Sequence, residues 1–474
     1  MKQIQNFGRN ISFTPEMNCH VESESDVLAV LKANPGKRFR AIGSLHAWSP
    51  TAATDQVLIE TQGLNQIDIE AGGQSVWVGA GCQVKKLLQT LSTKGLTLPS
   101  VGLIDKQTVA GATATATHGS GSMSLSAFIK AVRIAHFDSS GNAVITTVDQ
   151  GDALRAARCS LGLLGIVVAI QFECRPKYQI EEHARAHQTL TAAIAMEENY
   201  PRQQFYLMPW SWTYFGHHRV ESSQRRSALA TLYRIYCFTT IDVGLHVVVL
   251  LLARILKAAW AVRFFFRRIL PLTIARNWKV VDDSHAMLVM EHDLFRHIEI
   301  EVFVPRSKVH QATDFLVDVM SVFGDQPKKN PASTDQLLDS ISMGEKLKES
   351  AGSYVHHYPV CYRRVLPDPT LISTTSKSNH ADPDEDWYAI SFISYHHPEK
   401  RGGFFKFAEF IGPAVAELFG GRCHWGKHNP LDQKQNEELY PQLKPFLEIV
   451  DQFDAKSVFS NSWFDKVANS DAAQ

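Results

Sequence analysis

Alternating hydrophobic and polar positions divide the first third of the chain into short helices and strands. Apolar side chains fall on one helical face over residues 26–33, a helix that we expect Ser25 to cap and Pro35 to end. A second helical pattern covers residues 83–94, and residues 132–148 have the pattern of a hairpin. Short runs typical of β-strands occupy residues 39–42, 57–60, 75–79 and 165–172. This succession predicts a mixed α+β fold with many loops.

Length and composition place the chain among globular proteins of more than one domain. At 474 residues it is too long for one ordinary core, and 45% hydrophobic with 20% charged residues is typical of folded chains. Lys and Arg total 48 and Asp and Glu total 48, so the chain lacks the net positive charge that is typical of nucleic-acid-binding proteins. We therefore expect no nucleic-acid partner.

The cysteines and the N-terminus bear on the cellular compartment. Seven cysteines are scattered along the chain without a CxxC pair, which predicts free thiols and no metal site. The first residues, MKQIQNFGRNISFTPEM, contain no apolar stretch of signal-peptide length, so we expect no signal peptide. Both observations predict a reducing compartment on the cytoplasmic side.

Two loops in the first third are rich in small side chains. The first is Gly43-Ser44-Leu45-His46-Ala47, directly after a predicted strand, and the second covers residues 108–121. Small residues allow backbone N–H groups to converge on an anion, and Thr and Ser hydroxyls add donors, so both loops suit a pyrophosphate. Taken singly, each loop is equally well explained as a tight turn.

Taken in order, several segments resemble one family. They are RAIGSLHAWSP (residues 40–50), SVGLIDKQTVAGATATATHGSG (100–121), SLGLLGIVVAIQFECRP (160–176) and CHWGK (423–427). Together they resemble the sugar-1,4-lactone oxidase branch of the vanillyl-alcohol oxidase superfamily, which includes gulonolactone, arabinonolactone and alditol oxidases. The resemblance implies an α+β fold with a two-subdomain FAD-binding domain of the PCMH type and an α+β cap domain with an antiparallel sheet.

The resemblance also implies a domain division. Residues 1–177 are expected to form the FAD-binding domain and residues 178–420 the cap domain that covers the substrate. Residues 421–474 are expected to return to the flavin site.

In this family the histidine of the first loop carries FAD covalently, and His46 occupies that position here. The alternative is a loop histidine that caps a turn. Other residues matched to the FAD site are Ala41, Ile42, Gly43, Ser44, Leu45, Ala47, Thr108, Gly111, Thr115, Ala116, Thr117, His118, Ile166 and His424. Covalent attachment retains the cofactor and favours oxidation of an unactivated alcohol carbon, while the protein supplies orientation and electrostatics.

Three further residues are candidates for the chemistry. Lys427 would be a fixed positive charge beside flavin and substrate, and its alternative is a surface lysine at a turn. Arg363 matches the arginine of a substrate motif, E-x-R, in which Cys361 replaces the usual glutamate. A thiol replaces a carboxylate there, so the substrate is expected to differ from the usual lactones and alditols.

Gly102 bears on the electron acceptor. The resemblance places it beside the reactive edge of the flavin, where oxidases have Gly and dehydrogenases have Ala. A bare Cα would leave room for dioxygen, which favours an oxidase. The alternative is a turn glycine with a positive φ.

An apolar segment rich in basic residues interrupts the cap region at residues 235–274. Its longest uncharged run, residues 243–253, is shorter than the roughly 20 residues that a spanning helix requires. We expect a monotopic pair of amphipathic helices lying in the membrane surface, with Trp260, Phe264, Phe265 and Phe266 in the interface and cations such as Arg254 and Lys257 at the headgroups. A buried cap helix or an oligomer contact is the alternative.

Three functions remain open from the sequence. The first is an FAD-dependent oxidase that oxidises a sugar lactone, a polyol or a related hydroxylated small molecule and passes the electrons to dioxygen. The second is a flavin dehydrogenase that passes them to a membrane quinone or a cytochrome. The third is a membrane-associated flavoprotein without turnover.

Overall fold

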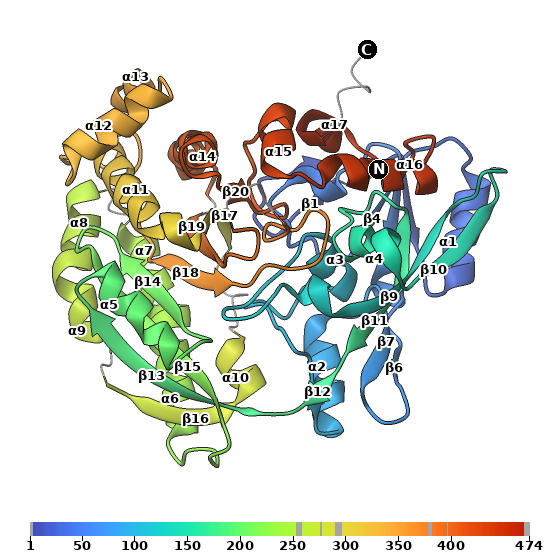
Figure 1. The fold of residues 1–474 in the computed structure, drawn as a ribbon, viewed down its shortest axis with the longest axis horizontal. Helices are drawn as coiled ribbons and strands as arrows, with labels where there is room; N and C mark the ends of the chain where they lie inside the picture. Colours follow the sequence, from blue (N-terminus) through green and yellow to red (C-terminus); the bar gives the residue numbers. More distant parts are fainter. Residues whose placement is uncertain are drawn as a thin grey trace.

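The computed structural model describes residues 3–252, 258–274, 277–289, 296–377, 382–395 and 397–468. Figure 1 shows two lobes: the N-terminal third and the last helices form one, and a large sheet with its covering helices forms the other. We call them the flavin lobe and the cap lobe. Helices and sheets contribute to both, which confirms the predicted α+β class.

The flavin lobe contains a parallel three-stranded sheet and an antiparallel five-stranded sheet. In the parallel sheet, β5 (Val57–Glu60) lies between β3 (Met17–His20) and β4 (Phe39–Ile42). The antiparallel sheet has the order β10-β9-β11-β7-β6. Its strands are β6 (Ile67–Ile69), β7 (Ser75–Gly79), β9 (Ile129–Phe137), β10 (Ala143–Val148) and β11 (Ile166–Glu173). Strands β9 and β10 pair directly, as the predicted hairpin requires.

Helices α1 (Glu24–Ala33) and α2 (Val84–Thr93) begin close to their predicted positions. Helix α3 (Val109–Ala114) lies within residues 108–121, where the prediction of a loop is wrong for these six residues, and α4 (Gly151–Arg158) completes the helices of this lobe. The prediction that Ser25 caps α1 is wrong, because Ser23 does so: its hydroxyl accepts from the N–H of Asp26, and the Asp26 carboxylate accepts from the N–H of Ser23.

The cap lobe is built on an eight-stranded sheet of order β16-β13-β15-β14-β18-β19-β17-β20. Its strands are β13 (Gln179–His187), β14 (Gln204–Met208), β15 (Thr213–Ser222), β16 (Lys279–Asp283), β17 (His297–Pro305), β18 (Val360–Val365), β19 (Trp387–Tyr395) and β20 (Arg422–Cys423). Helices α11 (Val309–Phe323) and α14 (Pro398–Phe419) share a hydrophobic core with one face of this sheet. The other face is turned toward the flavin lobe (Figure 1).

Along strand β17, apolar and charged side chains point to opposite faces of the cap sheet. Ile298, Ile300 and Val302 are buried in the core shared with α11 and α14. Because side chains alternate along a strand, Glu299 and Glu301 project from the opposite face, although they are also buried. The sheet therefore presents carboxylates to the junction between the lobes.

The C-terminal segment connects the two lobes. Strand β20 pairs with β17 of the cap sheet, although it lies within residues 421–474. The helices that follow are α15 (Gln433–Leu439), α16 (Leu443–Phe453) and α17 (Ser462–Ala468). Trp425, Tyr440 and Phe446 pack into the core of the flavin lobe. The turn between these contacts, residues 424–427, is thereby held at the junction.

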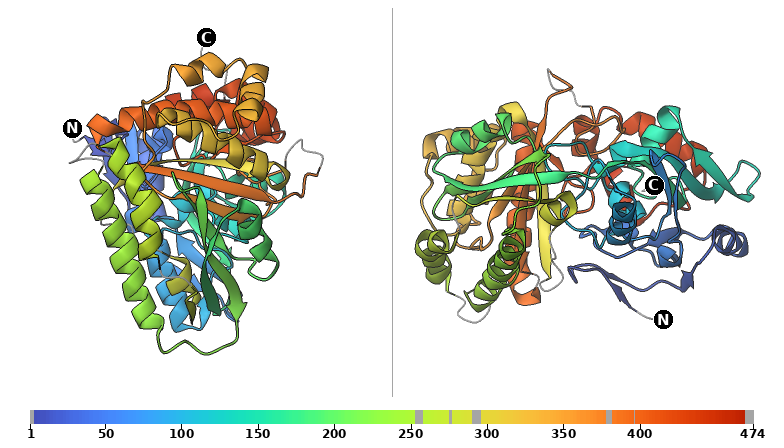
Figure 2. Two further views of the ribbon diagram at one scale, coloured as in Figure 1. Left: turned by 90° about the vertical axis from the view of Figure 1, so that its left-hand side faces the viewer. Right: turned by 90° about the horizontal axis from the view of Figure 1, so that it is seen from below.

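Two antiparallel helices lie side by side on the outside of the cap lobe (Figure 2). The first contains α6 (Ala230–Cys237), the π-helical η5 (Phe238–Leu245) and α7 (His246–Val249). The second contains α8 (Ala259–Phe264), the π-helical η7 (Phe265–Ile269) and α9 (Leu270–Thr273). We call them the helix pair. The described residues of this segment do not include Arg254, Lys257 or Ala253, which is the last residue of the uncharged run.

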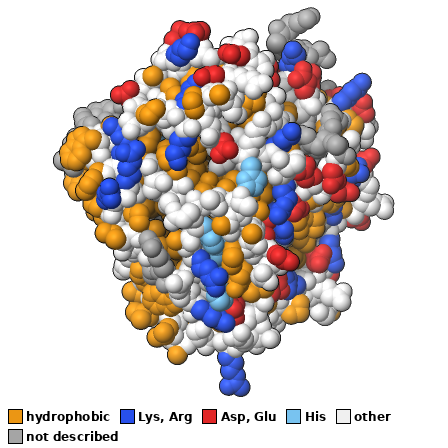
Figure 3. Space-filling view, turned by 60° about the vertical axis from the view of Figure 1, so that its left-hand side comes forward, with side chains coloured by type: hydrophobic (Ala, Val, Ile, Leu, Met, Phe, Trp, Pro, Cys, Tyr) orange, Lys and Arg blue, Asp and Glu red, His pale blue; other side chains and the backbone are white. Residues whose placement is uncertain are grey.

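The helix pair has a buried and an exposed face. Tyr233 and Val249 are buried against the rest of the protein, and so are Phe265 and Phe266, so the prediction that these two phenylalanines lie in the membrane interface is wrong. The exposed large hydrophobic residues are Leu229, Leu232, Ile235, Phe238, Val247, Leu251, Trp260, Phe264, Ile269 and Leu272. Figure 3 shows hydrophobic side chains gathered on this flank of the molecule. Among the described helices, Ala230–Leu250 alone is long and apolar enough to cross a membrane by length and composition.

Candidate active site

A cavity of about 320 Å³ lies where the flavin lobe, the cap sheet and the helix pair meet. On the flavin-lobe side its wall is formed by the end of β4, the loop that follows, and the region of α3. The polar face of the cap sheet and the turn at residues 424–427 form the opposite wall. The inner face of the helix pair closes the far end. We call this space the junction cavity.

The two loops of small residues lie against each other in the cavity wall. A Cβ atom on Gly43 would lie 2.0 Å from Oγ1 of Thr108, so only glycine allows this approach. The Thr108 hydroxyl caps α3 by accepting from the N–H of Gly111 at 3.4 Å. Leu45 adopts the left-handed region, with a φ of 54°, directly before His46. The loops predicted to hold a pyrophosphate are thus side by side.

His46 lines the cavity with a ring nitrogen that has no partner. Its ring stacks on Phe7 with the ring centroids 4.9 Å apart, and its buried Nδ1 makes no hydrogen bond within the described structure. Burial, together with the charges of Lys427 and Lys106, lowers the pKa of His46 to about 4. The imidazole is therefore neutral near pH 7, and a neutral ring with a free nitrogen is suited to bond formation with a flavin.

Most residues predicted to bind FAD or substrate line this one cavity. They are Ala41, Ile42, Gly43, Ser44, Leu45, His46, Ala47, Thr108, Gly111, Thr115, Thr117, His118, Arg363, His424 and Lys427. Three other predicted residues are absent from the wall: Gly102, Ala116 and Ile166.

The side chain of Ile166 is turned away from the cavity, so the predicted contact with the cofactor stays a prediction that only the backbone of Ile166 could fulfil. Alternation along β11 directs Ile166 into a hydrophobic core, while its neighbours Gly165 and Val167 line the wall. Ala116 is also buried in a core, behind Thr115 and Thr117.

Gly102 lies one layer behind the wall. Its φ is outside the left-handed region, so the explanation as a turn glycine with a positive φ is wrong. A Cβ there would lie 2.4 Å from Cγ2 of Thr117, which does line the cavity. The lack of a side chain at Gly102 thus determines where Thr117 sits, and any effect on dioxygen would act through Thr117.

Arg363 is buried at the centre of the cap-sheet wall. Its Nη2 donates to Oε1 of Glu301 at 2.5 Å and to Oγ of Ser391 at 3.0 Å. Burial opposes the charge of Arg363, but the Glu301 carboxylate raises the pKa of the guanidinium above its usual value. Its Nε is buried without a partner in the described structure. The guanidinium of Arg363 is therefore held in place by Glu301 and Ser391, and its Nε is left unsatisfied.

Lys427 and Glu299 form a second buried ion pair. The Nζ of Lys427 donates to Oε2 of Glu299 at 2.5 Å and lies 4.2 Å from the centroid of the Trp48 ring. Lys427 is 13% exposed, so the alternative of a surface lysine is wrong. Burial raises the pKa of Glu299 despite the charge of Lys427. Oε1 of Glu299 makes no hydrogen bond within the described structure and is not enclosed by protein atoms.

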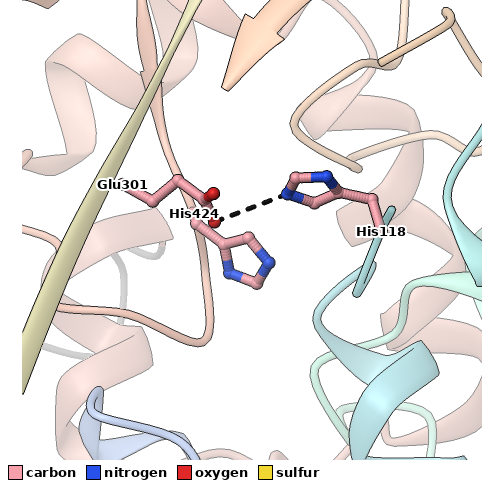
Figure 4. Close-up of side chains that lie close together, drawn as sticks. All are labelled: His118, Glu301 and His424. Carbon is pink, nitrogen blue, oxygen red and sulfur yellow. Dashed lines mark hydrogen bonds and ion pairs between the residues drawn. The ribbon is translucent and has the colours of Figure 1, made fainter. Parts of the chain in front are cut away.

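His118, Glu301 and His424 lie close together (Figure 4). Their potential ligand atoms lie within 4.8 Å of one another, a spacing that could admit a metal ion. However, Glu301 already binds Arg363 and Ser391 and lies 3.4 Å from Nε2 of His118, while Nδ1 of His424 accepts from the N–H of Gly426 at 3.0 Å. Glu301, His118 and Nδ1 of His424 are thus engaged by protein groups, whereas Nε2 of His424 makes no hydrogen bond within the described structure, and the expected lack of a metal stays a prediction.

Beyond Arg363 the cavity becomes apolar. Cys361 lies opposite Ser391 on one side and Tyr206 on the other, in the same row of the sheet. Burial raises the pKa of the Cys361 thiol to about 12, so the position carries no charge near pH 7. Further apolar and aromatic wall residues are Met208, Phe215, Tyr236, Ile241, Leu245, Leu270 and Tyr358. We call this part the apolar arm, and we call the region of Glu299, Glu301, Arg363 and Lys427 the charged end.

The sequence analysis missed the two glutamates of the charged end. The signal was present: in His297-Ile298-Glu299-Ile300-Glu301 polar and apolar residues alternate, which is the pattern of a strand with one polar face. This pattern does not identify the ion-pair partner of either carboxylate, because Arg363 and Lys427 are more than 60 residues away along the chain. Only the sheet order brings them together.

Comparison with known proteins agrees with this architecture. The FAD binding domain family matches residues 15–140, and the D-arabinono-1,4-lactone oxidase family matches residues 170–467. A long-chain alcohol oxidase of an uncultured marine euryarchaeote is 43% identical over 464 residues, which cover 97% of this chain and 96% of that protein. The L-gulonolactone oxidase of Mus musculus is 22% identical over 484 residues and covers 98% of each chain.

Solved structures confirm the fold. The crystal structure of cholesterol oxidase from B. sterolicum superimposes with a TM-score of 0.73 at 13% identity, covering 98% of this chain and 96% of that one. The matched families account for both lobes, and the relatives extend over nearly the whole chain. The chain therefore belongs to the D-arabinono-1,4-lactone oxidase family, in the sugar-lactone oxidase branch of the FAD-linked oxidoreductases that act on CH–OH groups.

Proposed function

We propose that this protein is an FAD-dependent oxidase that oxidises a hydroxyl-bearing carbon at the end of a long apolar chain. The observation that carries the proposal is the shape of the junction cavity, in which the charged end continues into the apolar arm. Sugar lactones and polyols carry hydroxyls along their whole length, and these would be desolvated in the arm without enough partners. The relative named a long-chain alcohol oxidase supports the same substrate class.

FAD is proposed to lie between the two loops of the flavin lobe and the cap sheet, bonded covalently to His46. The free Nδ1 of His46 and the close approach of Gly43 to Thr108 support this placement. When bound, FAD accepts the hydride from the carbinol carbon, which is the chemistry that the protein itself lacks. Acid precipitation should leave a yellow pellet for the wild type and a colourless one for His46→Ala. Flavin released equally from both would contradict the covalent bond.

The charged end is proposed to bind and activate the hydroxyl. Arg363 and Lys427 place positive charge where negative charge develops on the substrate oxygen. Glu299 is suited to accept the hydroxyl proton, because its Oε1 is free and burial raises its pKa above the usual value. Glu301 is a poor base, because Arg363 and His118 hold its pKa well below the usual range against the effect of burial.

Dioxygen is the proposed acceptor. It takes up the two electrons and two protons that leave the alcohol, so that the products are an aldehyde and hydrogen peroxide. Gly102 supports this choice. Because it has no side chain, Thr117 is not pushed toward the cavity, and room for dioxygen is kept there. A membrane quinone is the competing acceptor.

The helix pair is proposed to dock on the surface of a membrane with anionic headgroups. Its outer face combines exposed Trp260 and Leu272 with the exposed cations Arg267 and Arg268. The same helices line the apolar arm from their inner face, so a lipid-dissolved alcohol would have a short path to the flavin. Tyr233 is buried and hydrogen-bonded to Glu182 of the sheet, which supports an in-plane rather than a spanning arrangement.

Substrate preference tests the proposal directly. We expect oxygen consumption and peroxide production with primary alcohols, with kcat/KM rising roughly fourfold for each added methylene until the arm is filled. The comparison set is a sugar lactone and a polyol at equal concentration. Higher kcat/KM for the lactone or the polyol than for any alkanol would overturn the assignment.

A further inference from the structure

A buried polar network interrupts the wall of the apolar arm. It consists of Glu182 on β13, His217 and Arg219 on β15, and Tyr233 on α6, and we call it the His217 network. The Glu182 carboxylate is 1% exposed and accepts from Nδ1 of His217 at 2.9 Å, from Nε of Arg219 at 2.6 Å and from the hydroxyl of Tyr233. None of these residues belongs to the charged end.

The network leaves one possible acceptor, Nε2 of His217, without a partner among the described residues. Burial would raise the pKa of Glu182, but Arg219 and the hydrogen bonds donated by His217 and Tyr233 hold it below the usual range, so Glu182 stays ionised and balances Arg219. His217 is 6% exposed and lines the junction cavity. Its Nε2 makes no hydrogen bond within the described structure, yet it is not enclosed by protein atoms. That nitrogen therefore faces the cavity.

The tautomer of His217 follows from its partner. A carboxylate can only accept, so Nδ1 carries the hydrogen that is donated to Glu182. In the neutral ring Nε2 is then an acceptor, and the group that it binds best is a hydroxyl. An ether or ester oxygen, which has no hydrogen to donate, is excluded.

Sheet geometry gives the distance of this acceptor from Arg363 of the charged end. Gln204 on β14 lies opposite both Arg363 on β18 and His217 on β15. Two strand spacings separate Arg363 from His217, roughly 10 Å. A chain whose first hydroxyl lies at Arg363 would therefore pass His217 well along its length.

We propose that His217 forms a second binding site in the apolar arm, which accepts a hydrogen bond from another hydroxyl on the substrate chain. The preferred substrates are then long-chain diols and hydroxylated long-chain alcohols. This inference rests on the proposed function, because it assumes that the chain lies in the apolar arm.

Three probes of equal chain length test the site in the flavin-loaded enzyme: a monoalcohol, the terminal diol and the monomethyl ether of that diol. Several chain lengths are compared, beginning with the one that places the far oxygen roughly 10 Å from the hydroxyl bound at Arg363. We expect kcat/KM for the diol to exceed both others about tenfold, the effect of one hydrogen bond in a desolvated site. In His217→Phe this ratio should fall to near one, whereas the matched control Met208→Leu in the same wall should keep it.

Binding measured without turnover separates the two proposals. The shift of the flavin spectrum on addition of each probe reports occupancy of the cavity even if no probe is oxidised. Absence of oxidation together with tighter binding of the diol would reject the proposed function and keep the second site. Equal kcat/KM and equal binding of all three probes by the wild type would reject the second site, whether or not His217→Phe folds.

Discussion

The two ends of the junction cavity differ in whether charged or apolar side chains line them. At the charged end, Glu299, Glu301, Arg363 and Lys427 are nearly or fully buried and form two ion pairs. The apolar arm, by contrast, is lined by aliphatic and aromatic side chains and by the His217 network, which leaves one acceptor free. Buried ion pairs cost desolvation energy and are retained where charge must be stabilised, whereas an apolar wall selects by size. Reaction and substrate selection are thus separated in space.

The largest expected effect concerns the charged end alone. Glu299→Gln should lower kcat by about 10³-fold for all alcohols, because a general base is removed. The wild type should lose activity as the pH falls through the pKa of Glu299, which burial raises above the usual value near 4.3. The protonated form, present below that pKa, is the inactive one. A pH profile that keeps the same acidic limb in Glu299→Gln would assign the base elsewhere.

Lys427→Ala should lower kcat by about 10²-fold or more with FAD content retained, because one preorganised charge is lost. It also leaves Glu299 buried without its ion-pair partner, which lowers stability. The control is Lys427→Arg, which keeps the charge. Turnover in Lys427→Ala equal to the wild type would exclude a role in the reaction, and thermal unfolding would separate the stability effect.

Cys361→Glu is expected to make the lining of the apolar arm more similar to that of the charged end. A carboxylate at the entrance of the apolar arm should reduce kcat/KM for long-chain alcohols tenfold or more, since a charge must be desolvated there. Polyols should gain relative to alkanols, because the new carboxylate can accept from their hydroxyls. Cys361→Ser serves as the uncharged control. An unchanged ratio of polyol to alkanol kcat/KM would show that this position does not select the substrate.

Gly102→Ala should slow the reoxidation of the reduced enzyme by dioxygen about tenfold, because the added methyl displaces Thr117 toward the cavity. The double variant Gly102→Ala/Thr117→Ser removes the Cγ2 atom that clashes and should recover most of the rate. Stopped-flow reoxidation measures both. If the double variant is as slow as the single one, steric displacement of Thr117 is not the cause.

The smallest effect is expected at the outer face of the helix pair. Leu272→Glu should weaken binding to vesicles of phosphatidylcholine and phosphatidylserine about fivefold, because an exposed apolar contact is replaced by a charge of the lipid's own sign. Met17→Glu, an exposed apolar residue of the flavin lobe, is the matched control. Equal cosedimentation of wild type, Leu272→Glu and the control would argue against docking through this face.

Much of the flavin lobe could be predicted from local pattern. The hairpin of β9 and β10 and the strands β4, β5 and β7 follow from alternation and turn residues. The failures have equally local causes. Ser23 and Ser25 are both competent caps, and the choice depends on the carboxylate of Asp26. Ile166 was matched to the FAD site through the family resemblance, although alternation along β11 turns its side chain into the core.

The sequence by itself determined the family, the cofactor and the apolar character of the helix pair, because motifs and hydrophobic periodicity are local properties of the chain. It also identified Cys361 as a departure from the substrate motif. Only the tertiary structure decided what surrounds that thiol. Arg363, Glu301 and Ser391 come from three different strands, and the His217 network comes from two strands and a helix. Such sites depend on sheet order and long-range packing, which no local pattern encodes.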